Sequence, residues 1–118
     1  RRVLVVDDNV DAATSLATVL ELAGHEVRTA FGGLEALQVA DAFRPDTVLL
    51  DLNLPGVDGV EVGRRLRALP WARSASIIAL TGMGRPSDLA RTGEAGFDDH
   101  LTKPVQPEEV LKLIAGRH

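Results

Sequence analysis

The sequence predicts an α/β fold, in which five strand–helix units form a doubly wound five-stranded parallel sheet. Short apolar runs alternate strictly with longer segments of helical periodicity, five times along the chain. Three of the runs are almost continuously apolar, which is typical of strands buried on both faces. Two others mix apolar and charged residues, which suits the edges of a sheet. These observations place helices on both faces of the sheet.

The apolar runs are the expected strands. Three are expected inside the sheet, at Val3–Val6, Thr47–Leu50 and Ile77–Leu80. Two are expected at its edges, at His25–Ala30 and Phe97–Leu101. With the second and fifth strands outermost, right-handed crossovers favour the order 2-1-3-4-5, the flavodoxin-like arrangement.

The helices are expected between these strands. In Asn9–Ala23, apolar residues recur three and four positions apart, and Gly24 ends the pattern. Asp58 followed by Glu61 resembles a capping box, and it opens a helix that ends at Pro70. The other expected helices are Leu34–Phe43, which Pro45 closes, a weaker one over Pro86–Ala95, and Pro107–Ala115, which has Pro107 in its first turn.

Composition excludes several classes of function. The 118 residues include no cysteine, so thiolate metal sites, disulfides and cysteine nucleophiles are excluded. The formal net charge is −4, which disfavours direct binding to nucleic acid or to anionic membranes. The apolar stretches are too short to cross a membrane. We therefore expect a cytoplasmic domain that fills residues 1–118.

Chemically notable side chains fall where the expected strands end. Asp7 and Asp8 end the first apolar run, Asp51 ends the third and Thr81 the fourth, while Lys103 follows the fifth. Parallel strands present their carboxyl ends at one edge of the sheet, and ligands bind there where the strand order reverses. We therefore expect three carboxylates, a hydroxyl and an ammonium group to converge at this edge.

Each of these residues also has an ordinary structural interpretation. Asp8 or Asn9 could cap a helix, Thr81 could be a common strand residue, and Lys103 a solvated one. Three adjacent carboxylates, however, repel one another unless a cation joins them, and hard oxygen ligands favour Mg²⁺. Such a site can hold a phosphoryl group, and Asp51 is the best candidate for a carboxylate nucleophile.

At this point the chain resembles the receiver domains of two-component response regulators and hybrid sensor histidine kinases. The resemblance covers essentially the whole chain, and its motifs are specific in combination. They are Val5-Val6-Asp7-Asp8-Asn9, Leu49-Leu50-Asp51-Leu52-Asn53-Leu54-Pro55-Gly56-Val57-Asp58-Gly59, Leu80-Thr81-Gly82 and Lys103-Pro104.

The resemblance implies a role for each site residue. Asp51 would accept a phosphoryl group, and Thr81 and Lys103 would hold the phosphoryl oxygens. Mg²⁺ would be bound by Asp8 directly, by Asp7 mainly through water, by Asp51, and by the backbone carbonyl of Asn53. The Lys103–Pro104 peptide bond would be cis.

The resemblance also implies partners. The donor would be a phosphohistidine on a sensor histidine kinase or a histidine phosphotransfer domain. The output domain or protein would bind the fourth helix, fifth strand and fifth helix.

The chain opens Arg1-Arg2-Val3 without Met and ends soon after Ala115, so we expect it to be part of a hybrid sensor kinase or multidomain regulator. An isolated response regulator is the alternative. The domain would be a signalling switch that catalyses its own phosphorylation and dephosphorylation, rather than an enzyme.

Three other functions compete with this one. A dehalogenase-type phosphatase would need a second acid where Asn53 stands, and an amide cannot act as a general acid. A nucleotide- or flavin-binding domain would need a glycine-rich first turn, but Asp7 and Asp8 stand there and would repel phosphate. Gly82 and Gly84 follow the fourth strand, but the third glycine of a dinucleotide-binding motif is missing. A receiver that binds partners without being phosphorylated is the third, although all five site residues are present.

His100 departs from the family pattern, because an aromatic residue often stands three positions before the site lysine and moves inward with Thr81. Imidazole can be buried or exposed and titrates near neutral pH. If His100 is the switch residue, output affinity should vary with pH between about 6 and 7. Binding of the phosphorylated form to its output partner, measured across that range, checks this. A flat profile would leave His100 as an ordinary exposed histidine.

Overall fold

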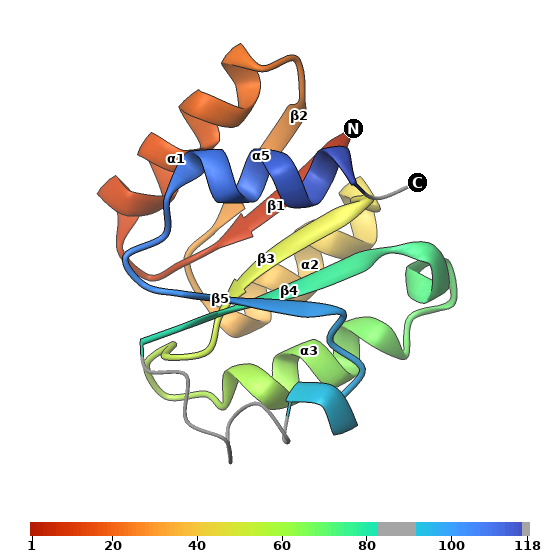
Figure 1. Ribbon diagram of the computed structural model, residues 1–118. Coiled ribbons are helices and arrows are strands. Elements are labelled where there is room, and N and C mark those ends of the chain that lie inside the picture. Colours follow the sequence, from red (N-terminus) through yellow and green to blue (C-terminus); the bar gives the residue numbers. More distant parts are fainter. Residues whose placement is uncertain (83–91, 117–118) are drawn as a thin grey trace.

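The computed structural model describes residues 1–82 and 92–116, which hold a five-stranded parallel sheet in the order β2-β1-β3-β4-β5 (Figure 1). This confirms the predicted fold class, strand order and edge strands. The strands are β1 (Arg2–Val6), β2 (Glu26–Ala30), β3 (Thr47–Asp51), β4 (Ser76–Thr81) and β5 (Asp99–Thr102).

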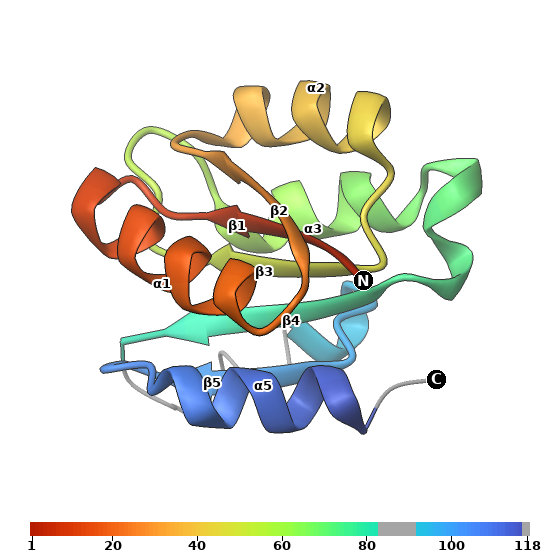
Figure 2. The same cartoon turned by 90° about the horizontal axis from the view of Figure 1, so that it is seen from above.

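Helices cover both faces of the sheet. α1 and α5 lie on one face, and α2 and α3 on the other (Figure 2). Their bounds are Val10–Leu22 for α1, Gly33–Phe43 for α2, Gly59–Arg67 for α3 and Pro107–Ala115 for α5. The helix expected over Pro86–Ala95 falls largely on residues 83–91, which lie outside the described residues. None of the helices described is long and apolar enough to cross a membrane.

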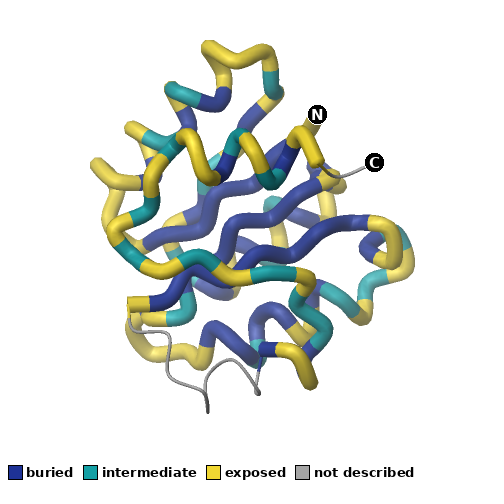
Figure 3. The backbone as a smooth tube through the Cα atoms, viewed as in Figure 1, coloured by how far each residue is buried: buried dark blue, intermediate teal, exposed yellow. Residues whose placement is uncertain are grey.

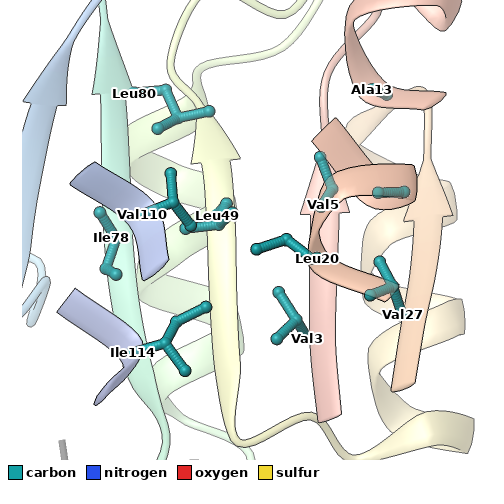
Figure 4. Close-up of a cluster of buried hydrophobic side chains, with 11 residues drawn as sticks. Val3, Val5, Ala13, Leu20, Val27, Leu49, Ile78, Leu80, Val110 and Ile114 are labelled. Carbon is teal, nitrogen blue, oxygen red and sulfur yellow. The ribbon is translucent and has the colours of Figure 1, made fainter. Parts of the chain in front are cut away.

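Two hydrophobic cores sandwich the sheet. Every residue of β3 and β4 is buried, which explains why these strands are almost continuously apolar in sequence (Figure 3). Alternate strand residues point to opposite faces. Val3, Leu49 and Ile78 therefore pack beneath α1 and α5 (Figure 4), whereas their sequence neighbours pack beneath α2 and α3.

Short polar side chains set the starts of two helices. The side-chain oxygen of Asn9 accepts a hydrogen bond from the backbone N–H of Ala12 at 3.0 Å, so Asn9 rather than Asp8 caps α1. Asp58 accepts from the N–H of Val60 at 2.9 Å and caps α3, as its position in the sequence predicts. Both caps lie in loops that leave the carboxyl edge of the sheet, so they also fix where the site loops turn.

Arg67, at the end of α3, ties together the opposite, amino edge. Its guanidinium donates to the backbone carbonyl oxygens of Ala72 at 2.8 Å, Ala75 at 2.7 Å and Gly96 at 3.0 Å, and it pairs with Asp98. The guanidinium fork suits several fixed acceptors at once. We refer to this arrangement as the Arg67 clasp. The sequence pattern did not predict it.

The segment after α3 differs from the expectation that Pro70 simply ends the helix. Pro70 instead opens a short 3₁₀-helix, η1 (Pro70–Ser74), because its fixed φ suits a first helical position. Trp71 on η1 packs against the core beneath α2 and α3 and donates from Nε1 to Asp41 at 3.3 Å. The connection is therefore part of the packed structure.

Candidate functional site

The predicted site residues converge at the carboxyl edge of the sheet. Asp7 follows β1, Asp51 ends the adjacent β3, and Thr81 ends β4. Carboxylate oxygens of Asp7, Asp8 and Asp51 all lie within 4.8 Å of one another. The Nζ atom of Lys103, after β5, lies 2.6 Å from Oδ2 of Asp51. Topology alone thus gathers side chains that lie up to 96 positions apart, from residue 7 to residue 103.

Two of the carboxylates are oriented by their own loops. Oδ1 of Asp7 accepts a hydrogen bond from the N–H of Asn9 at 3.0 Å. Oδ1 of Asp51 accepts from the N–H of Asn53 at 2.9 Å. In each loop, a backbone donor two residues further along holds one oxygen. The other oxygen of Asp51 therefore faces Lys103.

Burial makes this cluster of charge unfavourable. Asp51 is 1% exposed and Asp7 8% exposed, whereas Asp8 is exposed. Burial raises the pKa of Asp7 above its usual value, and the nearby charge of Asp51 adds to this effect, although the hydrogen bond from Asn9 opposes it. A divalent cation would relieve the repulsion. The donor set contains only hard oxygens, so Asp7, Asp8 and Asp51 fit Mg²⁺.

Thr81 completes the far side of the site. Its hydroxyl oxygen is buried and has no hydrogen-bond partner in the part of the chain that the structure describes. The N–H of Lys103 donates to the carbonyl oxygen of Thr81 at 2.7 Å, so the two residues are held side by side. The Lys103–Pro104 peptide bond is cis. A buried hydroxyl without a partner is uncommon, and that of Thr81 lies at the same edge of the sheet as Asp51.

Asn53 and His100 lie further out. The side-chain amide of Asn53 lies beside Gly82, since a Cβ atom at Gly82 would be 3.3 Å from its Nδ2. His100 is exposed on the edge strand β5. Its role as a switch residue stays a prediction.

Sequence analysis missed a groove beside the site, which we call the α1–α5 groove. Its volume is about 620 Å³. It is lined by Asp7, Asp8, Asn9, Ala12, Ser15, Leu16, Val19, Leu80, Lys103, Pro104, Val105 and Pro107. One signal could have revealed part of it: Ala12, Leu16 and Val19 are apolar and recur four and three positions apart on α1, where Leu16 also packs against the core.

The arrangement suits phosphoryl transfer to a carboxylate. Asp51 offers an oxygen nucleophile whose position is fixed, and Lys103 and Thr81 offer an ammonium group and a hydroxyl next to it. Asp7 and Asp8 supply the oxygens that a divalent cation needs.

Comparisons with known proteins show which proteins the chain resembles. A family model described as "Response regulator receiver domain" matches residues 3–115. The transcriptional regulatory protein PrrA of Mycobacterium tuberculosis is 45% identical over 113 residues, which cover 96% of this chain and 48% of PrrA. The chain thus spans about half the length of the curated relatives that it matches.

Solved structures show the same architecture. The chemotaxis protein CheY4 of Vibrio cholerae superposes with a TM-score of 0.93 at 32% identity, over 99% of this chain and 98% of that one. The signal receiver domain of a histidine kinase from Syntrophus aciditrophicus gives 0.85 at 31% identity, over 97% and 86%.

The raised pKa of Asp7 predicts how metal-free stability depends on pH. An ionised Asp7 opposes folding above its folded-state pKa, and protonation removes this penalty as the pH falls through that pKa. In EDTA, Asp7→Asn should therefore be more stable than wild type at neutral pH. The difference in stability between the two proteins should disappear as the pH falls towards 4. Thermal unfolding followed by circular dichroism from pH 8 to about 4 checks this.

Asp11→Asn is the matched control, because Asp11 is an exposed acid in the first turn of α1. It should give no gain at neutral pH. A loss of stability in Asp7→Asn, or a gap that does not change with pH, would contradict the prediction.

Proposed function

The chain belongs to the response regulator receiver domain family, and we propose that it is a phosphoacceptor in a two-component phosphorelay. A phosphohistidine on a sensor histidine kinase or a histidine phosphotransfer domain would supply the phosphoryl group, and Asp51 would receive it. One observation carries the proposal: the buried carboxylate of Asp51 has one oxygen fixed by a backbone N–H and the other against Lys103, beside Asp7 and Asp8.

The transfer exchanges one bond to phosphorus for another. An oxygen of Asp51 forms a bond to phosphorus while the donor's N–P bond breaks, and the electron pair leaves with the imidazole nitrogen. Lys103 and Thr81 then hold the phosphoryl oxygens by hydrogen bonds. Mg²⁺, bound by Asp7, Asp8, Asp51 and the carbonyl of Asn53, would offset charge on the carboxylates and the phosphoryl group.

Phosphorylation would be read as a signal. The added dianion lies next to the hydroxyl of Thr81, which has no partner in residues 1–82 and 92–116. The backbone of Thr81 accepts a hydrogen bond from the N–H of Lys103 after β5. A movement of Thr81 towards the phosphoryl group would thus reach β5 and α5, which we propose as part of the output face. The fourth helix, the remaining part, lies largely outside the described residues.

We propose that the full-length protein is a multidomain regulator. PrrA, a transcriptional regulatory protein, supports this because the chain matches about half of it. A hybrid histidine kinase is the second candidate, and the receiver domain of the Syntrophus aciditrophicus kinase supports it. In both, this domain acts as a switch and leaves the output to another part of the protein.

The central prediction is a Mg²⁺-dependent phosphoryl adduct. With Mg²⁺ and acetyl phosphate, the intact mass should rise by one phosphoryl group, and Asp51→Asn or EDTA should abolish the rise. Asp46→Asn is the matched control, because Asp46 is an exposed acid just before β3, at the opposite edge of the sheet. It should still form the adduct.

Absence of the adduct in wild type, under conditions where the domain is folded, would contradict the proposal. If a beryllofluoride phosphoryl mimic then also failed to bind, a module that binds partners without phosphorylation would become the leading function.

The buried hydroxyls of Thr81 and Thr47 have no hydrogen-bond partner among the described residues, and they predict a contrast between Thr81→Val and Thr47→Val. Removing either hydroxyl should stabilise the unphosphorylated domain by about 1 kcal/mol, because each costs desolvation without a hydrogen bond in return. Only Thr81→Val should slow phosphorylation, by about tenfold or more, since a hydrogen bond to a charged group is lost. Thr47 begins β3, at the far end from Asp51.

Thermal unfolding and the rate of adduct formation measure the two effects. Equal phosphorylation rates in the two variants would show that the Thr81 hydroxyl has no part in the site.

A further inference from the structure

We propose that the α1–α5 groove binds the leaving group of small phosphodonors, so that the domain prefers acyl phosphates with a longer aliphatic acyl chain to acetyl phosphate. This inference rests on the proposed function, because it concerns what occupies the space beside Asp51 before transfer. It names a class of substrate, the alkanoyl phosphates.

The groove is continuous with the phosphoryl site. Its lining includes Asp7, Asp8 and Lys103, the charged groups that surround Asp51, and it continues along α1 through Ala12 and Leu16. α1 and α5 lie on the same face of the sheet (Figure 2). The groove is lined by residues of α1 and of the segment that leads from β5 into α5, so it runs between them. A donor whose phosphoryl group lies at the charged end can extend the rest of the molecule into the groove.

The walls of the groove suit an aliphatic chain. On α1, the side chains of Ala12, Leu16 and Val19 are apolar, and Val105 and Pro104 are apolar on the opposite wall. A volume of about 620 Å³ lies within the range of small-molecule sites, which are mostly apolar with a few polar groups at one end. The charged end and the apolar walls here have that composition.

The reaction balances without any further reactant. An oxygen of Asp51 forms the new O–P bond, and the bond between phosphorus and the acyl oxygen breaks. The electron pair leaves with that oxygen, so the second product is the alkanoate anion, and no proton is transferred. Alkanoates of different chain length are leaving groups of nearly equal basicity. Differences in rate along the series therefore report binding in the groove.

The expected effect follows from the apolar area that each chain buries. Each methylene that the groove removes from water should raise the second-order rate constant for phosphorylation about fourfold. Butyryl phosphate, with two more methylenes than acetyl phosphate, should therefore react about fifteenfold faster at low donor concentration. Carbamoyl phosphate is similar in size to acetyl phosphate but more polar, and it should gain nothing.

The experiment measures the rate of adduct formation by intact mass, in Mg²⁺, with acetyl, propionyl, butyryl and carbamoyl phosphate. Ser15→Trp places an indole in the groove from an exposed position on α1. It should reduce the butyryl-to-acetyl rate ratio from about fifteen to about one. Thr14→Trp is the matched control on the same helix, since Thr14 is exposed and does not line the groove. It should keep the ratio of wild type.

The outcomes separate this inference from the proposed function. If acetyl phosphate phosphorylates Asp51 and the alkanoyl series gives equal rates, the groove inference is wrong and the proposed function stands. The groove inference is also wrong if Ser15→Trp and Thr14→Trp have the same butyryl-to-acetyl rate ratio. If no donor forms an adduct, both fail. The inference would be supported if the phosphorylation rate rises with the length of the acyl chain and if Ser15→Trp, but not Thr14→Trp, abolishes this rise.

Discussion

The repulsion among three carboxylates at one edge of the sheet is the constraint around which this domain is organised. Parallel strands end at the same edge, and the crossover that places β1 beside β3 brings Asp7 and Asp8 to Asp51. The pKa of Asp7 is raised by burial and by the charge of Asp51, so the ionised form of Asp7 is unfavourable in this cluster. Lys103 offsets part of this cost through its ion pair with Asp51.

The two edges of the sheet have opposite characters. At the carboxyl edge, like charges repel and the hydroxyl of Thr81 has no partner among the described residues. At the amino edge, the Arg67 clasp satisfies several backbone carbonyl oxygens at once and closes an ion pair with Asp98. The hydrogen bonds and the ion pair at the amino edge thus stabilise the fold, and they offset the repulsion and the unpaired hydroxyl at the carboxyl edge. Such a division is expected where function requires groups that folding alone would not favour.

Most of the fold could be predicted from the sequence, because a strand that is buried on both faces must be apolar along its whole length. Such a strand can therefore be recognised as an apolar run. Thr47–Asp51 and Ser76–Thr81 extend the predicted strands by only one or two residues. The site residues could be placed together because each ends or follows a strand. The Arg67 clasp could not be predicted, since apart from Asp98 its acceptors are backbone carbonyl oxygens, which every residue carries. The α1–α5 groove depends on how far α1 stands from the segment entering α5, a distance that no pattern within either segment specifies.

The position of η1 has a spectroscopic consequence. Trp71 is the only tryptophan in the chain, and it lies just before β4 begins, at the edge of the sheet remote from Asp51. The chain has no tyrosine, so ultraviolet excitation at long wavelength reaches a single indole that is half-buried against the core and bonded to Asp41. Its emission is suited to reporting whether the polypeptide is folded. The carboxyl edge of the sheet, where Asp7, Asp8 and Asp51 lie, carries neither tryptophan nor tyrosine, so this emission comes from the other end of the sheet.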